Sequence, residues 1–347
     1  MSQSLTLIQP DDWHLHLRDG AALHSVVDAT ARSFARAVVM PNLKPPVRTL
    51  AEAVAYRGRI LSALSTDLEF DPLMTLYLTD STSAADIYEA SESEFVVAAK
   101  LYPAGATTNS DAGVTDLARI DGALAAMART GLRLLVHGEV THGDVDVFDR
   151  EAAFLESVLG PLMQRHPELR VVLEHITTSQ GVDFVRQFSA ERCGGTITPH
   201  HLLLNRNALF EGGIRPHRYC LPILKRERHR QALVEAATSG DPHFFLGTDS
   251  APHLRSAKES ACGCAGMYTA PNALGLYAEV FEAANALEHL EAFASLNGPR
   301  FYGLPANTRR VTLVRQPQEV PQTLELADGV VVPFRAGGTV AWGRAEA

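Results

Sequence analysis

The run Phe95-Val96-Val97-Ala98-Ala99-Lys100-Leu101 is a short apolar stretch that carries one lysine near its end. A second apolar run, residues 132–137, follows after about thirty residues in which polar and apolar residues are mixed. Between the two runs, apolar side chains recur at helical spacing: Leu117, Ile120, Leu124 and Met127. A strand, an amphipathic helix and a second strand form a βαβ unit, which predicts parallel strands covered by helices.

The same alternation extends along most of the chain. Eight short apolar runs, each bounded by polar, Gly or Pro residues, are candidate strands: residues 13–17, 36–41, 73–78, 95–101, 132–137, 170–175, 195–198 and 243–247. Eight βα units predict a (β/α)₈ barrel of the TIM type. The alternative is a doubly wound open sheet, but no Gly-rich turn follows the first run, as dinucleotide binding would require.

The pattern changes after Pro305. Short strands punctuated by Pro and Gly are predicted at residues 310–314, 322–326, 330–334 and 339–342. We therefore expect residues 1–347 to form a single barrel domain, with about 305–347 as a C-terminal tail packed on the barrel.

Composition narrows the class of protein. The 347 residues include 46% hydrophobic residues and carry a net charge of −9, which disfavours binding to nucleic acid. No run approaches the roughly 18 apolar residues of a membrane span, and the first residues lack the pattern of an export signal. Four cysteines are too few to staple a chain of this size, so we expect a reducing, cytoplasmic location.

Side chains that bind metals or move protons stand at the ends of the predicted strands. In a barrel these ends meet at one rim, where catalytic groups gather. The set is His14, His16, Lys100, His137, His175 and Asp249. Because side chains alternate along a strand, His14 and His16 are predicted to face the same side and could chelate one divalent metal. Taken singly, each histidine is equally well explained by a hydrogen bond in the core.

Lys100 favours the metal hypothesis. It follows five apolar residues, where a charged ammonium is costly. It could reach the rim or pair with an acid. Alternatively, desolvation lowers its pKa and makes the amine a nucleophile that captures carbon dioxide as a carbamate. That anion could bridge two cations, and with four histidines and Asp249 it would complete a six-ligand site for two zinc ions.

Several of these residues lie in motifs that resemble a known family. The motifs are Asp11-Asp12-Trp13-His14-Leu15-His16-Leu17-Arg18-Asp19-Gly20, Met40-Pro41-Asn42, Lys100-Leu101-Tyr102-Pro103, His137-Gly138-Glu139-Val140-Thr141-His142, Glu174-His175-Ile176-Thr177 and Gly247-Thr248-Asp249-Ser250-Ala251-Pro252-His253. Together they resemble the dihydroorotases of the shorter bacterial type, in the amidohydrolase superfamily. The similarity runs from the first strand to beyond Phe301, and the tail is less diagnostic.

The resemblance implies a metal centre and a reaction. His14, His16, Asp249 and a carboxylated Lys100 (N6-carboxylysine) would bind one Zn²⁺. The same carbamate, with His137 and His175, would bind the second, and a bridging hydroxide would be the nucleophile. The family cyclises N-carbamoyl-L-aspartate reversibly to L-dihydroorotate plus water in pyrimidine (UMP) biosynthesis, with the residue matching Asp249 as the proton shuttle.

The resemblance also implies substrate contacts. Arg18 offers a planar fork for the ligand's carboxylate, which suits the metal site better than a surface salt bridge with Asp19. Further contacts are implied at these positions: His16, Asn42, His137, His253, and the backbone at Leu221 and Ala265. Thr107 and Thr108 would reach the ligand from a closing lid loop, in which Gly105 replaces an asparagine and makes closure entropically costlier.

The family further suggests a homodimer. Two rival hypotheses remain: the same machinery acting on a hydantoin or dihydropyrimidine ring, and a non-catalytic barrel that serves as a scaffold. Two other features have simpler interpretations. Cys262 and Cys264 are expected to be loop thiols, because their spacing fits neither C-x-x-C pattern. His200 and His201 are expected to have a structural role near the rim.

Overall fold

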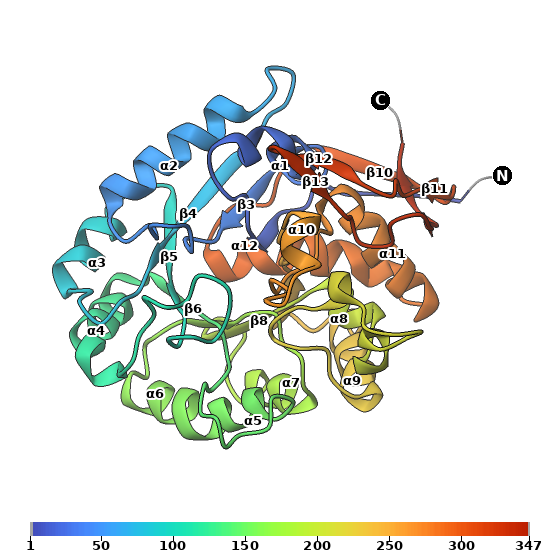
Figure 1. The fold of residues 1–347 in the computed structure, drawn as a ribbon. Helices are drawn as coiled ribbons and strands as arrows, with labels where there is room; N and C mark the ends of the chain where they lie inside the picture. The colour runs from blue at the N-terminus through green and yellow to red at the C-terminus, as the bar shows by residue number, and fades with distance from the viewer. Residues whose placement is uncertain (1–2, 346–347) are drawn as a thin grey trace.

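The computed structural model describes residues 3–345. Its largest sheet has eight parallel strands that follow one another in chain order, and Figure 1 shows them ringed by helices. The strands are β2 (Asp12–Leu15), β3 (Arg36–Val39), β4 (Asp71–Tyr77), β5 (Val96–Leu101), β6 (Arg133–Val136), β7 (Val171–Leu173), β8 (Cys193–Ile197) and β9 (Phe244–Leu246). Each corresponds to one of the eight predicted apolar runs.

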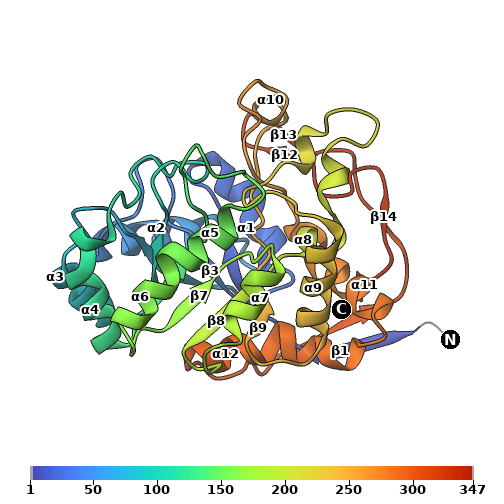
Figure 2. The same cartoon turned by 90° about the horizontal axis from the view of Figure 1, so that it is seen from below.

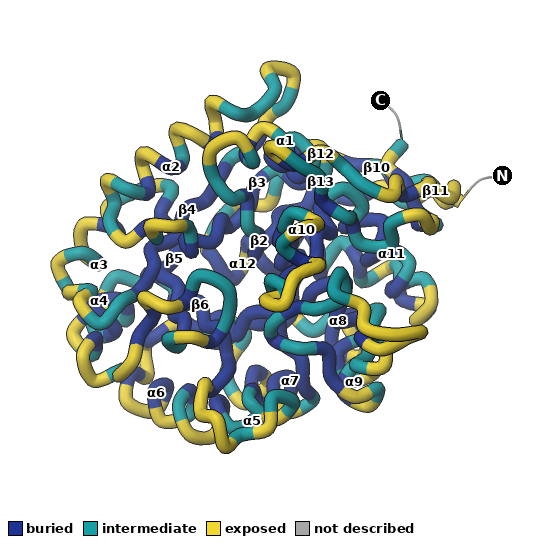
Figure 3. The backbone as a smooth tube through the Cα atoms, in the orientation of Figure 1, coloured by how far each residue is buried: buried dark blue, intermediate teal, exposed yellow. Residues whose placement is uncertain are grey.

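The helices lie outside the strands. They are α1 (Ala21–Ala31), α2 (Leu50–Ala63), α3 (Ala84–Ser91), α4 (Asp121–Thr130), α5 (Arg150–Phe154), α6 (Gly160–Arg165), α7 (Ser179–Val185), α8 (Pro199–Leu203), α9 (Glu227–Thr238), α10 (Arg255–Lys258), α11 (Ala273–Ala283) and α12 (Asn297–Tyr302). A π-helical turn, η2 (Leu155–Leu159), joins α5 to α6. Of the predicted apolar stripe, Leu124 and Met127 are buried in α4, while Leu117 and Ile120 lie in a 3-10 turn just before it, with Ile120 buried and Leu117 partly buried. The buried side chains show that α4 covers the sheet. Figure 3 shows the same contrast between buried strands and exposed outer surfaces.

The sheet closes between its first and last strands. The backbone N–H of Asp249 donates to His14 O at 2.8 Å, and the N–H of His16 donates to Ser250 O at 3.0 Å. These bonds bring the two edges together, so the predicted (β/α)₈ barrel is confirmed and the open-sheet alternative is wrong.

Aromatic side chains fill the amino end of the barrel. Trp13 stacks on Tyr302 of α12, with ring centroids 4.3 Å apart, and Phe245 and Phe301 pack beside them. A Cβ at Gly298 would lie 1.9 Å from the Trp13 indole nitrogen, so α12 can approach this closely only with glycine there. Figure 2 shows α12 at the end opposite α10. The carboxyl end is therefore left for polar side chains.

The C-terminal residues lie against the barrel. β10 (Arg310–Val314) pairs antiparallel with β1 (Ser4–Ile8) and with β15 (Gly343–Arg344). The other strands pair with one another: β12 (Leu324–Leu326) with β13 (Gly329–Val331), and β11 (Gln318–Glu319) with β14 (Thr339–Val340). The prediction placed β10 at the same residues and β12, β13 and β14 in overlapping ones. It missed β1, β11 and β15, which are short or have exposed residues.

Among residues 3–345, no helix combines the length and the apolar character that crossing a bilayer requires.

Candidate active site

The six predicted metal-ligand side chains converge at the carboxyl end of the barrel. His14 and Lys100 lie in β2 and β5, and the other four come from residues just beyond the ends of β2, β6, β7 and β9. Ring centroids are 5.4 Å apart for His14 and His16, 5.0 Å for His14 and His175, and 4.8 Å for His137 and His175. The structure thus brings together side chains that are more than 200 residues apart in sequence.

The imidazoles are in the form that binds a metal. Burial lowers the pKa of His14, His137 and His175, so the neutral rings keep a free lone pair. Nδ1 of His175 is buried without a hydrogen-bond partner, and the His14 nitrogens face carboxylate oxygens, with Nδ1 2.9 Å from Glu174 Oε1 and Nε2 3.3 Å from Asp249 Oδ1. An unpaired buried nitrogen is costly unless a ligand satisfies it. Candidate donor atoms from His14, His16 and Asp249 lie within 4.8 Å of one another, so this set fits a divalent cation.

Lys100 is fully buried among these groups. Burial lowers the pKa of its amine well below the usual value, which favours the neutral, nucleophilic form. Its Nζ contacts the Glu174 carboxylate, in keeping with the alternative of a lysine paired with an acid. Sequence reasoning missed Glu174 as this partner. The sequence signal that could have indicated it is the position of Glu174, a carboxylate directly after the apolar run 171–173.

Asp249 lies between two histidines. Its Oδ1 is 3.3 Å from His14 Nε2 and 3.1 Å from His16 Nε2. Burial alone would raise the pKa of Asp249, but these imidazoles more than offset it and hold the pKa well below the usual range. Asp12, which sequence reasoning did not single out, accepts from the backbone N–H groups of Thr248 at 2.9 Å and His14 at 3.1 Å. It therefore fixes the segment before Asp249 to the first strand.

Arg18 lies at the same rim with its guanidinium oriented by the segment after Asp249. Its Nε donates to Pro252 O at 2.9 Å, and its Nη2 is 2.9 Å from His253 Nε2. The alternative of a salt bridge between Arg18 and Asp19 is wrong, because Asp19 accepts two hydrogen bonds from Arg59 at 2.9 and 2.7 Å. No carboxylate is paired with Arg18 among the described residues, so the fork can receive an anion.

One small cavity unites most of the predicted residues. It is lined by His14, His16, Arg18, Asn42, Tyr102, Thr107, Thr108, His137, His175, Leu221, Asp249, Ala251, Ala265 and Gly266. Of the predicted set, Lys100 and His253 are outside this lining: Lys100 is fully buried, and His253 contacts Arg18 and Ala265. Tyr102, Ala251 and Gly266 were not predicted, since nothing about an isolated small or aromatic residue marks it as lining a cavity.

The predicted lid loop reaches the cavity. The side-chain amide of Asn42 donates to Thr108 O at 3.1 Å, and the side-chain amide of Asn109 donates to Asn42 O at 3.0 Å. Gly105 in this loop has a φ of 78°, which glycine adopts at little cost. Asn42 is therefore bonded to this loop beside Thr107 and Thr108, which line the cavity.

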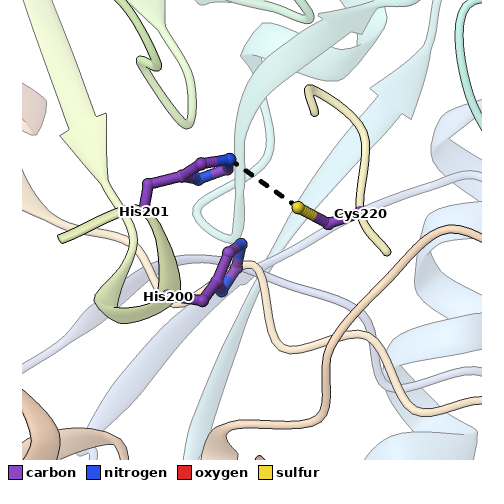
Figure 4. Close-up of side chains that lie close together, drawn as sticks. All are labelled: His200, His201 and Cys220. Atoms are coloured by element: carbon purple, nitrogen blue, oxygen red, sulfur yellow. Dashed lines mark hydrogen bonds between the residues drawn. The ribbon is translucent and has the colours of Figure 1, made fainter. Parts of the chain in front are cut away.

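A second histidine cluster, formed by His200, His201 and Cys220, lies outside the cavity lining (Figure 4). Both ring nitrogens of His201 are already used: Nδ1 is 2.8 Å from Thr198 Oγ1, and Nε2 is 2.9 Å from Pro222 O. A carbonyl accepts only from N–H, so Nε2 carries the proton and cannot bind a metal without losing this bond. These contacts agree with the predicted structural role of His201, whereas both ring nitrogens of His200 are buried without a hydrogen-bond partner.

Comparisons with known proteins agree with this geometry. The amidohydrolase family model matches residues 5–312. A dihydroorotase of Cupriavidus pinatubonensis is 64% identical over 342 residues, which cover 99% of each chain. A crystal structure of dihydroorotase from Campylobacter jejuni has a TM-score of 0.91 at 36% identity, covering 100% of this chain and 98% of that one. A dihydroorotase from Saccharomyces cerevisiae, solved in complex with 5-fluoroorotic acid, has a TM-score of 0.90 at 32% identity, covering 99% and 98%.

The matches to dihydroorotases span the barrel, the tail and every segment that contributes to the cavity. The chain therefore belongs to the amidohydrolase family and, within it, to the dihydroorotases, which are cyclic amide hydrolases.

Proposed function

We propose that this chain catalyses the reversible cyclisation of N-carbamoyl-L-aspartate to L-dihydroorotate plus water, in pyrimidine biosynthesis, with two zinc ions. The 64% identity to a dihydroorotase supports the reaction class. The yeast relative was solved with 5-fluoroorotic acid, an acidic ring that resembles the proposed ligand. An acidic ligand also suits the guanidinium of Arg18, which has no carboxylate partner among the described residues.

The metal ligands would be the six convergent side chains. His14, His16, Asp249 and a carboxylated Lys100 would hold one ion, and the same carbamate with His137 and His175 would hold the other. Bound zinc would supply a water of lowered pKa and would polarise the amide carbonyl under attack. The unpartnered Nδ1 of His175 supports this assignment, because a cation would satisfy it.

Asp249 would move the proton. In the ring-opening direction, the attacking water loses a proton as its oxygen bonds to the amide carbon. The Asp249 carboxylate would accept that proton and deliver it to the ring nitrogen as the C–N bond breaks. Ring closure would run through the same steps in reverse. The low pKa of Asp249 keeps it ionised and ready to accept a proton at neutral pH.

Substrate recognition would be the task of the residues around Arg18. The guanidinium would bind the ligand's carboxylate, with hydrogen bonds added by Asn42 and His253. The imidazoles of His16 and His137 and the backbone at Leu221 and Ala265 would complete the pocket, and Thr107 and Thr108 would reach the ligand from the lid loop. A closed loop excludes water and strengthens these polar contacts.

One observation carries the proposal: a fully buried lysine beside four convergent histidines and Asp249, with Nδ1 of His175 left without a hydrogen-bond partner. The test is steady-state turnover of L-dihydroorotate and of hydantoin by zinc-loaded protein, together with a metal count. We expect two zinc ions per chain and a strong preference for dihydroorotate. Preferred turnover of hydantoin would favour the rival ring substrate, and a well-folded, metal-free and inert chain would favour the scaffold.

We also propose that the chain works as a cytoplasmic homodimer and that residues 1–347 form one folding unit, with about 305–347 as the tail. The backbone pairing of β10 with β1 supports the single unit, because it joins the two ends of the chain. Sedimentation equilibrium would test the dimer: a mass of one chain across micromolar concentrations would contradict it.

A further inference from the structure

Lys258 is a buried cation that the proposed reaction does not use. It ends α10, which lies above the carboxyl end of the barrel in Figure 2, and it is 3% exposed. Its Nζ donates to three backbone carbonyls: Tyr219 O at 2.7 Å, Cys264 O at 2.7 Å and Gly266 O at 2.8 Å. An ammonium has three protons, so these bonds use all of them. Peptide dipoles, rather than a carboxylate, thus satisfy this charge.

The three carbonyls belong to two segments that form one wall of the cavity. Leu221 lies in the first segment, and Ala265 and Gly266 lie in the second. The N–H of Gly266 donates to Tyr219 O at 3.0 Å, so the two segments also bind each other. The Nζ of Lys258 therefore bonds to both segments of this wall and links them to each other.

The contact with Cys264 sets the direction of one particular N–H group. The Cys264 carbonyl and the Ala265 N–H belong to one planar trans peptide, so they point in opposite directions. Because the Cys264 carbonyl accepts from Lys258, the Ala265 N–H is directed away from Lys258, toward the side on which Ala265 lines the cavity. In the described part of the chain no backbone carbonyl accepts from this N–H, whereas Ala265 O lies 2.9 Å from His253 Nε2.

The orientation of the 264–265 peptide depends on two rotations, about the Cα–C bond of Cys264 and about the N–Cα bond of Ala265. A rotation of the peptide about these two bonds would turn the Ala265 N–H away from the cavity. The hydrogen bonds from Lys258 to the carbonyls of Cys264 and Gly266, on either side of Ala265, oppose such a rotation.

We propose that Lys258 is a positioning residue for substrate binding: it fixes the Cys264–Ala265 peptide so that the Ala265 N–H donates to the ligand's carboxylate. This inference rests on the proposed function, which places an acidic ligand in the cavity. The Lys258 charge acts on the same peptide and makes its N–H a stronger donor. Because this bond forms equally in the bound substrate and in the transition state, its loss raises KM and spares kcat.

The test compares Lys258→Met with the zinc-loaded parent enzyme. We expect KM for L-dihydroorotate to rise about tenfold or more, because a hydrogen bond to a charged group contributes that much to binding. We expect kcat to stay within about threefold and the zinc content to be unchanged. The matched control is Arg255→Met, which removes the same charge from the same helix at a half-exposed side chain. Its KM should stay within about twofold.

Lys258→Gln is the second variant, since its neutral amide keeps two donors for the same carbonyls. KM is measured on whichever variant folds, and thermal unfolding is recorded for both. A KM within about twofold of the parent, or a fall in kcat at constant KM, overturns the proposal. Failure of both variants to fold overturns it in favour of a purely structural role. A parent chain that turns over neither substrate refutes the proposed function instead.

Discussion

The molecule contains two buried histidine clusters, and they differ in what their ring nitrogens contact. At the rim of the barrel, the His14 nitrogens lie 2.9 Å from Glu174 Oε1 and 3.3 Å from Asp249 Oδ1, and Nδ1 of His175 has no hydrogen-bond partner. In the cluster of His200, His201 and Cys220, both nitrogens of His201 are bonded, to Thr198 and to Pro222, but neither nitrogen of His200 has a hydrogen-bond partner. Unpaired nitrogens occur in both places, so they do not separate a candidate metal site from a structural cluster. What separates the two clusters is the carboxylates that lie beside the imidazoles at the rim.

The electrostatic settings of the clusters differ as well. The rim cluster includes a buried amine, Lys100, and an ionised carboxylate, Asp249, whereas the other cluster includes only the thiol of Cys220. Burial raises the pKa of Cys220 to about 12, so it is a neutral thiol and a poor metal ligand near neutral pH. Substitutions at the rim should therefore lower metal content and activity, whereas substitutions in the other cluster should leave both close to those of the parent.

Lys100→Ala should have the largest effect. If Lys100 carries the proposed carbamate, its loss would leave the rim cluster unable to hold two cations, and we expect turnover to fall by about 10⁴-fold or more. Zinc content should fall in parallel, and small carboxylic acids added to the assay should restore part of the activity. Metal analysis and dihydroorotate turnover check both points. A variant with full zinc content and normal turnover would remove Lys100 from the site.

Asp249→Ala should reduce kcat by about 10³-fold, because a positioned proton carrier contributes on this scale. Turnover is measured at saturating substrate, and zinc is counted in the same sample to separate proton transfer from loss of metal. If more than about a tenth of the activity remained, another group would have to carry the proton.

Arg18→Met should reduce kcat/KM by about 100-fold, since it removes a charged partner from a buried carboxylate. We expect KM to rise and kcat to fall while both zinc ions stay bound, because the methionine stem still fills the space. Kinetics measured with N-carbamoyl-L-aspartate and with L-dihydroorotate check this prediction. Unchanged constants for both compounds would show that the carboxylate binds elsewhere.

His201→Ala should have the smallest effect on activity and a clear effect on stability. It removes the hydrogen bonds to Thr198 and Pro222 and should lower the free energy of unfolding by about 2 kcal/mol. Turnover and zinc content should stay close to those of the parent. Chemical denaturation and metal analysis check the two expectations, with Cys220→Ala as the companion variant. Loss of one zinc ion per chain in either variant would make this cluster a metal site.

Much of the fold could be predicted because a parallel sheet buried on both faces has a simple sequence pattern. The eight short apolar runs stand out from the amphipathic helices, and polar residues at their ends mark the rim. The pairing of β1 with β10 could not be predicted in this way. The alternation in β1 is short, and its partner lies about 300 residues further along the chain.

The site residues fall into two groups for the same reason. Histidines at strand ends are visible in one sequence, because their position alone places them at the rim. Glu174, Asp12 and Lys258 each have a partner that is distant in sequence, at separations of 74, 236 and 39 residues for Lys100, Thr248 and Tyr219. The residue types around these three positions do not indicate those partners, so only the folded structure reveals them.

The chemical state of the Lys100 side chain is the most direct test of the account. Protein prepared with zinc and ¹³C-labelled bicarbonate can be examined by ¹³C NMR, with metals counted in the same sample. We predict a carbamate resonance that is absent from Lys100→Ala, together with two zinc ions per chain. A free amine at Lys100 in a chain that binds no zinc under these conditions would contradict the account.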